Sequence, residues 1–299
     1  MRSSILFKCL SLFCVMQSLI SAQTIQVAYS DLIPVEFDQY LLDKPILSDL
    51  TLETTQAGTL PMIEEFIAGR LDICLLAIPE GDELPILNEP GITLLPFAYQ
   101  SAVVIVNADN PIVELTFDQL ASIFGASSSD IEVKSWRDLG LAAFSTSSIK
   151  AHASKGPQSV SSDLFRFTLL NTNPFKNTVQ ISTPETVERL VAQDKVAIGI
   201  VPNLPQRENL KVVFLAKDRE AIAYGPNQDN LYFNDYSIRL PFYIAFREND
   251  TQRLLPVLDF LLKDTVAQYL EAVDFFPVPK MIRDKFAIDL LLFVQENEN

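Results

Sequence analysis

The sequence predicts an α/β protein of two domains, on three observations. The chain has 299 residues, which is enough for two domains of ordinary size. Hydrophobic residues make up 48% of the chain and charged residues 20%, a balance that provides a substantial core and is typical of globular proteins. Strand-like segments alternate with amphipathic segments of about 8–12 residues, which favours layered sheets with mostly parallel strands.

The first 22 residues predict a secretion signal that is cleaved from the mature protein. Arg2 and Lys8 supply a positive start, Cys9–Met16 is apolar, and Ser21–Ala22 offers small residues before a cleavage site. A membrane anchor is the alternative, but it would need about 20 apolar residues. A lipoprotein would use Cys14, but the residue before it is a bulky phenylalanine where small residues are expected. The predicted location is therefore the periplasm or the exterior.

Cleavage would leave a strongly acidic protein with one cysteine. The removed segment carries two cations and no acids, so the net charge changes from −15 to −17. This charge disfavours nucleic acid and anionic membranes as partners, and it works against long-range attraction of an anionic ligand. Cys74 lies in the apolar stretch Ile73–Ala77 and has no partner for an internal disulfide, so we expect a small buried hydrophobe.

The N-terminal part of the mature chain predicts strands that each lead into a helix or turn. Thr24–Tyr29 and Leu50–Thr55 alternate as half-buried strands do, whereas Asp72–Ala77 is apolar enough for a central strand. Thr59 is expected to cap a helix over Leu60–Gly69.

Capping signals mark two helices in the middle of the chain. Thr116 and Gln119 form a capping-box pair for the helix that ends at Phe124. Ser161 or Ser162 is expected to cap a helix that follows, over residues 163–170.

The C-terminal part continues the same alternation. Thr183 precedes Pro184, which suits the first turn of a helix through Ala192, and the strand Val196–Val201 follows. Further elements are predicted as a strand over Ile238–Phe246 and helices over Leu254–Leu262, Thr265–Val273 and Phe286–Val294. With no long Gly/Ser linker, the chain is expected to cross between the domains more than once, at Ala102–Asn107 and around Leu215–Tyr232.

Several motifs, in order, resemble the solute-binding proteins of phosphate-type ABC transporters. The segment Leu115–Phe124 begins Leu-Thr-Phe-Asp-Gln-Leu, and Lys134–Gly140 follows with a Trp-Arg-Asp-Leu-Gly turn. Val196–Val201 is similar to the family's Ala-Ile-Gly-Tyr strand, Arg239–Phe246 to its Arg-Pro-Leu-Tyr strand, and Phe276–Val278 to its C-terminal tail. Each piece is weak alone, but their order and spacing together are moderately specific.

The resemblance implies a two-lobed type II periplasmic-binding-protein fold. Each lobe would be a mixed sheet flanked by helices, and a ligand cleft would lie between the lobes. The implied boundaries are 1–22 for the signal, 23–101 with 233–299 for lobe 1, and 102–232 for lobe 2 with crossing segments. The implied function is not enzymatic and needs no cofactor: capture of a small, phosphate-like oxyanion for an ABC permease in the membrane.

The family's binding residues are matched only in part. Ser30 matches its early serine-rich turn, and Gly58 with Thr59 matches its Gly-Ser-Gly turn. The family motif Gly-Ser-Gly-Thr-Arg corresponds here to residues 158–162: Ser159 and Ser161 stand for the Ser and Thr, both glycines are missing, and Ser162 replaces the arginine. After the third strand, Ala77 and Ile78 occupy a polar ligand position. These departures concern phosphate itself more than the fold.

An anion site also follows from the residues alone. Helix N-termini present unpaired N–H groups and a positive dipole end, and three of them carry small hydroxyl residues here. The alternative is that these residues are simple caps, each worth about 1 kcal/mol. A missing arginine removes charge-assisted hydrogen bonds of ~1.5–3 kcal/mol, and Lys155 is the nearest cation to replace it. A neutral or larger ligand is therefore also compatible.

Two other functions stay open on the sequence. The lost glycines and arginine favour a degenerate module with a sensory or protein-interaction role. A secreted hydrolase would use His152, the single histidine, but no acid partner is recognisable for it. One histidine gives no metal cluster, and no dinucleotide or phosphate-loop motif is present. Trp136, the single tryptophan, is expected to be structural.

Overall fold

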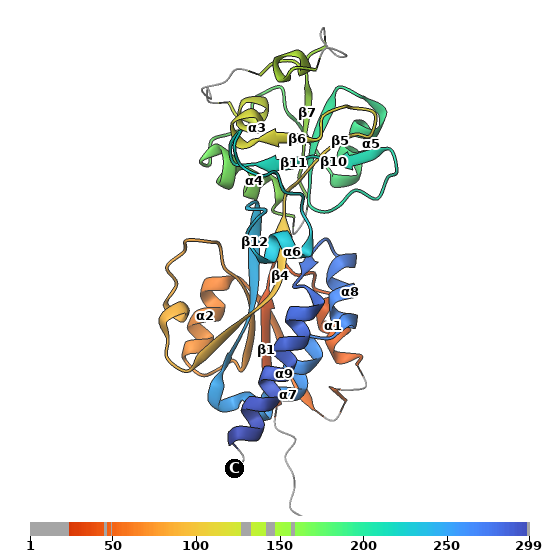
Figure 1. The fold of residues 1–299 in the computed structure, drawn as a ribbon. Helices are drawn as coiled ribbons and strands as arrows, with labels where there is room; N and C mark the ends of the chain where they lie inside the picture. The colour runs from red at the N-terminus through yellow and green to blue at the C-terminus, as the bar shows by residue number, and fades with distance from the viewer. Residues whose placement is uncertain are drawn as a thin grey trace, which may run out of the picture.

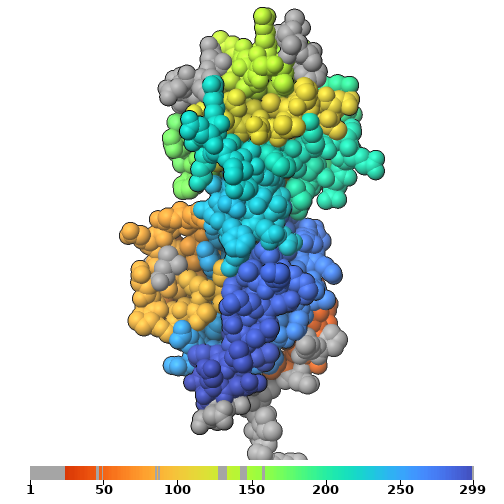
Figure 2. Space-filling view, in the orientation of Figure 1, coloured from red at the N-terminus to blue at the C-terminus, as the bar shows by residue number. Residues whose placement is uncertain are grey.

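The computed structural model describes residues 24–44, 47–48, 50–126, 133–141, 147–156 and 159–297. They form two lobes stacked end to end, joined by a narrow waist (Figures 1 and 2). The predicted signal and Gln158 lie outside the described residues. Among the helices of this described part, none combines the length and apolar character that crossing a bilayer requires.

Lobe 1 is built on a six-stranded sheet of order β13-β4-β12-β3-β1-β2. Strands β1, β2 and β3 are parallel, and β12 runs antiparallel to both β3 and β4. Its strands are β1 (Thr24–Ser30), β2 (Thr51–Ala57), β3 (Ile73–Ala77), β4 (Ile92–Ser101), β12 (Arg239–Arg247) and β13 (Phe276–Pro277). The sheet is therefore mixed, as the resemblance implied.

Helices cover both faces of this sheet (Figure 1). They are α1 (Phe37–Leu42), α2 (Thr59–Ile67), α7 (Thr251–Leu261), α8 (Asp264–Ala272) and α9 (Lys280–Asn297), with 3-10 turns η2 (Pro85–Asn88) and η5 (Glu248–Asp250). Alternate side chains of a strand enter different cores: Ala28 packs in the core under α2, whereas Val27 and Tyr29 pack in the core under the other helices. Cys74 is fully buried under α2, which confirms the predicted hydrophobe, and burial raises its pKa to about 12.

Lobe 2 contains a five-stranded sheet of order β10-β5-β9-β7-β8 and a two-stranded sheet. The strands are β5 (Val103–Asn107), β7 (Lys150–Ser154), β8 (Gln180–Ser182), β9 (Ala197–Val201) and β10 (Leu210–Val212), with β6 (Glu114–Thr116) and β11 (Phe214–Ala216) paired separately. The helical elements are α3 (Phe117–Phe124), η3 (Trp136–Leu139), α4 (Ser161–Leu170), α5 (Pro184–Gln193) and α6 (Gln228–Tyr232). The lobe boundaries given in the sequence analysis remain a prediction.

Three of the local predictions in lobe 2 are confirmed. The Thr116 hydroxyl accepts from the Gln119 N–H at 3.3 Å and the Gln119 side chain accepts from the Thr116 N–H at 2.8 Å, which is the predicted capping box. Thr183 caps α5 by accepting from the Thr186 N–H at 3.4 Å. Trp136 is fully buried, and its indole N–H donates to the Val196 carbonyl at 3.0 Å.

Two capping predictions are wrong. Helix α4 begins at Ser161, with Val160 at its N-cap, and α2 begins at Thr59, with Gly58 at its N-cap. Neither helix has a side-chain cap, because the hydroxyls near each start bond to strand ends instead. Within the described residues, the first N–H groups of α2 and α4 therefore receive no side-chain cap.

The two crossing segments are hydrogen-bonded side by side at the waist. The first passes from β4 to β5 at Ala102, and the second leads from α6 into β12. The Tyr236 hydroxyl donates to the Ala102 carbonyl at 2.7 Å, and the Ser101 hydroxyl donates to the Ile238 carbonyl at 2.7 Å. Arg239 packs over the Tyr99 ring and pairs with Glu80, which fixes the second segment to lobe 1.

Packing of α5 on β9 depends on Gly199, and we expect Gly199→Ala to destabilise the fold. A Cβ atom there would lie 2.7 Å from Val187 and 2.9 Å from Val191, both in the core under α5. Overpacking of this kind costs about 1–3 kcal/mol, measurable as a lower urea midpoint at unchanged m-value. Gly156→Ala is the matched control, since its Cβ would meet nothing closer than 3.8 Å. Equal stabilities of the two variants would contradict this account of the interface.

Candidate ligand-binding site

The carboxyl ends of parallel strands from both lobes meet at the junction of the lobes. In lobe 1, β1, β2 and β3 run parallel to β4, which leads into lobe 2. In lobe 2, β7, β8 and β9 run opposite to β5, which leads away from lobe 1. Ligands of open α/β sheets bind in crevices outside the carboxyl ends of strands. The junction is therefore where a site is expected.

The predicted residues of lobe 1 come together at this junction, but their hydroxyls are used internally. Ser30 ends β1 beside Ala57 at the end of β2, which places it near Gly58 and Thr59. The Ser30 hydroxyl accepts from the Leu32 N–H at 3.2 Å. The Thr59 hydroxyl donates to the carbonyl that ends β3, at 2.9 Å. These contacts fix the two turns; the Thr59 hydroxyl donates its proton to a strand end, whereas the Ser30 hydroxyl acts in its turn only as an acceptor.

Serines form a compact cluster where β7 meets α4 in lobe 2. The hydroxyl of Ser161 lies 3.0 Å from that of Ser154 and 3.2 Å from that of Ser159. The Ser162 hydroxyl donates to the Ser154 carbonyl at 2.6 Å. Ser154 and Ser161 are fully buried, whereas Ser159 and Ser162 are half-buried. The cluster anchors the start of α4 to the end of β7.

Helix α4 begins without a side-chain cap. The first intrahelical bond runs from the Leu164 N–H to the Val160 carbonyl at 2.7 Å. Within the described residues, no acceptor lies on the N–H groups of Ser161, Ser162 or Asp163. Unpaired N–H groups at a helix start, with the positive dipole end, favour an anion.

A crevice between the lobes opens beside this helix start. It has a volume of about 190 Å³ and is lined from lobe 1 by Leu32, Pro34, Ser101 and Asp274, and from lobe 2 by Ser159 and Ser161. Burial raises the pKa of Asp274 above its usual range, although a hydrogen bond with Asn203 acts in the opposite direction. Among the described residues, no lysine or arginine lines the crevice. A carboxyl, not a cation, is its titratable group.

A larger groove adjoins the crevice on the other side of the helix start. Its volume is about 610 Å³, and it shares Leu32, Ser159 and Val160 with the crevice. Ser162 and Lys155 also line it. Ser159 and Ser161 therefore face the crevice, and Ser159 and Ser162 face the groove, while Ser30, Gly58 and Thr59 line neither.

Residues of the crevice that the sequence analysis missed come from elements far apart in the chain. Ser101 and Gln100 end β4, Pro202 follows β9, and Asp274 follows α8. None of them lies in a motif. Asp274 is distinguished locally by a left-handed backbone, with φ at 66°, but this conformation is seen only in the structure and not in the sequence.

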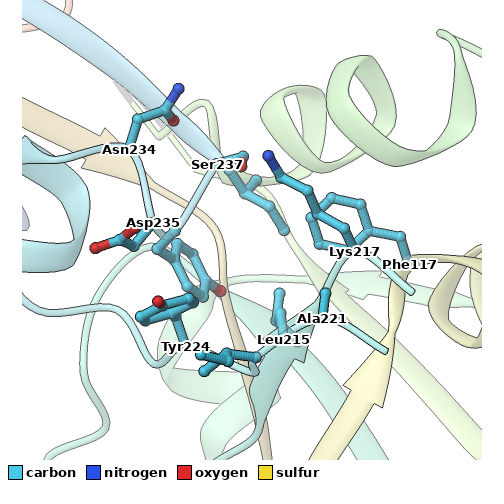
Figure 3. A pocket seen from close by; sticks show the side chains of 11 residues that line it. Phe117, Leu215, Lys217, Ala221, Tyr224, Asn234, Asp235 and Ser237 are labelled. Atoms are coloured by element: carbon cyan, nitrogen blue, oxygen red, sulfur yellow. The ribbon is translucent and has the colours of Figure 1, made fainter. Parts of the chain in front are cut away.

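A third hollow lies at the waist and contains none of the predicted site residues. It has a volume of about 230 Å³ and lies between the turn after β11 and the second crossing segment. Lys217 and Phe117 form one wall, and Asn234, Asp235 and Ser237 lie opposite (Figure 3). Phe117 begins α3, but the Thr116 hydroxyl caps that helix start by accepting from the Gln119 N–H, so the hollow lacks the uncapped helix start found beside the crevice.

His152, the residue that a hydrolase would use, is buried inside lobe 2. It lies in the middle of β7, 5% exposed, and its Nδ1 has no hydrogen-bond partner in the part of the chain that is described. Burial is the main cause that lowers its pKa. The described residues also contain no group of three or more potential metal ligands.

The comparisons with known proteins agree with this architecture. No family model matches the sequence. Over 261 residues the chain is 25% identical to the phosphate-binding protein PstS of Staphylococcus aureus (strain USA300), covering 84% of this chain and 77% of that protein.

Solved structures resemble it over most of its length. A possible phosphate binding protein from Planctomyces limnophilus DSM 3776 aligns with a TM-score of 0.67 at 18% identity, covering 91% of this chain and 99% of that one. PstS from Borrelia burgdorferi aligns at 0.67 and 16% identity, covering 86% and 99%. These likenesses confirm the predicted type II periplasmic-binding-protein fold and the resemblance to phosphate-type solute-binding proteins.

Buried His152 makes a pH-dependent contribution to stability. The pKa of His152 is lowered in the folded protein, whereas in the unfolded chain it has the ordinary histidine pKa of about 6.5. As the pH falls through 6.5, the unfolded state binds more protons and the free energy of unfolding drops, by up to about 1.4 kcal/mol per pH unit. His152→Gln should flatten this decline in urea titrations between pH 7 and pH 5. Parallel curves for the two proteins would contradict it.

Proposed function

We propose that this chain is an exported solute-binding protein that holds a small oxyanion between its lobes for ABC-type uptake. The observation that carries the proposal is the start of α4, whose open N–H groups and serine hydroxyls lie where the crevice and the groove meet. The resemblance in sequence and fold to phosphate-binding proteins supports the same reading.

The serine cluster suits an anion site without forming one alone. Ser161 holds the first turn of α4 against Ser154, so the N–H groups keep a fixed direction. Fixed dipoles bind an anion without reorganising, and they do so without net positive charge on the protein. The ligand would then be released to a membrane permease, the partner that the family resemblance implies.

A degenerate interaction module is the second candidate, and two observations favour it. The crevice contains Asp274 where an anion site would gain from a cation. The Asp31 carboxylate oxygen also lies near the start of α2, 3.9 Å from where a Cβ of Gly58 would be. A protein of this kind would bind no oxyanion at all, which separates the two candidates experimentally.

A thermal-shift panel on the mature chain tests the proposal. The ligands are phosphate, sulfate, molybdate and small organic acids, each titrated at constant ionic strength. A ligand at a hundred times its dissociation constant should add about 2.7 kcal/mol to the free energy of unfolding. No shift with any member of the panel would leave the degenerate module as the function.

Ser159→Asp should weaken anion binding while leaving the fold intact. A carboxylate beside the start of α4 stabilises the helix dipole but repels an anionic ligand from the same N–H groups. We expect at least a tenfold (~1.4 kcal/mol) loss of affinity by isothermal titration, with an unchanged or raised melting temperature. Ser159→Asn, of equal size and without charge, is the control and should retain most of the affinity. Retained affinity in Ser159→Asp would place the anion elsewhere.

A further inference from the structure

The groove beside α4 concentrates positive charge in an acidic protein. Three cations line it, Lys155, Arg166 and Lys176, against one carboxylate, Asp163. The whole chain carries a formal net charge of −15. The crevice, by contrast, has an acid and no cation among its described lining residues. An anionic group that reaches the start of α4 is therefore favoured on the groove side.

Of these three cations, Lys155 is the one that can meet a ligand. Arg166 donates to the carbonyls of Thr172 and Asn173, at 2.8 and 3.2 Å. Lys176 donates to the Ser122 carbonyl. Lys155 is bound through its backbone, whose N–H donates to the Ser182 carbonyl at 2.8 Å, while its side chain is exposed. Among the described residues no carboxylate pairs with its amine.

The groove is larger than a bare inorganic ion needs, and part of its wall is apolar. Its volume of about 610 Å³ lies within the ~300–1,000 Å³ typical of sites for organic ligands. Ile181, 56% exposed, and Phe175 form an apolar wall. A single tetrahedral ion would leave this wall in contact with water, whereas an organic body would cover it.

We propose that the ligand is a phosphomonoester, an oxyanion carried on an organic body. This inference rests on the proposed function and names its substrate class. The phosphoryl oxygens accept from the open N–H groups of α4 and from the Lys155 amine, which takes the place of the missing arginine. The body lies along Ile181 and Phe175.

Equilibrium binding of phenyl phosphate, glycerol 3-phosphate and inorganic phosphate to the mature chain tests the inference. Phenyl phosphate should bind at least tenfold tighter than inorganic phosphate, because its ring covers the apolar wall; tenfold corresponds to ~1.4 kcal/mol. Lys155→Gln should weaken phenyl phosphate and inorganic phosphate alike, by about tenfold or more. Ile181→Ser should reduce the preference for phenyl phosphate about fivefold while leaving inorganic phosphate unchanged.

Two control variants separate these effects from changes in net charge or surface hydrophobicity. Lys150→Gln alters the first residue of β7, at the opposite end of that strand from Lys155, where the Lys150 amine pairs with Asp194. Ile222→Ser removes an isoleucine, 72% exposed, that lines the hollow at the waist. Both should change affinity less than about twofold, since exposed substitutions remote from a site have small effects.

The outcomes distinguish this inference from the proposed function. Inorganic phosphate binding as tightly as both esters would overturn the inference and leave the proposed function standing. Absence of binding by all three ligands would overturn both. Tighter binding of phenyl phosphate that Ile181→Ser does not affect would overturn the assignment of the body to this groove.

Discussion

The antiparallel pairing of β12 in lobe 1 and of β5 in lobe 2 directs the carboxyl ends of the neighbouring parallel strands toward the junction of the lobes. Strand β12 reverses against β3 and β4, and β5 reverses against β9. Because the chain leaves one lobe through β4 and enters the other through β5, the parallel strands of the two large sheets end at the junction. Open peptide groups, turns and helix starts then collect in one place. The bonds of Tyr236 and Ser101 across the two crossing segments hold this arrangement.

In the described part of the chain, the start of α4 has no side-chain cap, and the N–H groups of its first turn have no acceptor. A side-chain cap would stabilise the helix by about 1 kcal/mol, and suitable hydroxyls are present at Ser159, Ser161 and Ser162. They bond instead to Ser154 or to each other. α5 in the same lobe is capped conventionally by Thr183. Open donors at α4 are therefore a local feature of the junction and not a general property of the lobe.

Sequence patterns predicted most of the elements because the physics that forms them is local. The capping box of Thr116 and Gln119, the apolar β3 and the packing role of Trp136 all follow from neighbouring residues. The prediction that a serine caps α4 was wrong for a non-local reason: the serine hydroxyls at its start bond to Ser154 in β7, which a local sequence pattern does not show. Asp274 and Ser101 could not be predicted as crevice residues for the same reason, since only the fold brings them to the crevice.

Charge in this protein has to be considered locally. The overall charge of −15 opposes the approach of an anion at long range. The Debye length is only about 8 Å at physiological ionic strength, so distant carboxylates are screened once a ligand has reached the junction. In the proposed complex, the groups that then act on the ligand are those in contact with it: the N–H dipoles at the start of α4, the Lys155 amine and, across the crevice, the Asp274 carboxyl. The opposed character of crevice and groove gives an asymmetric ligand a reason to bind in one orientation, with its anionic group toward Lys155.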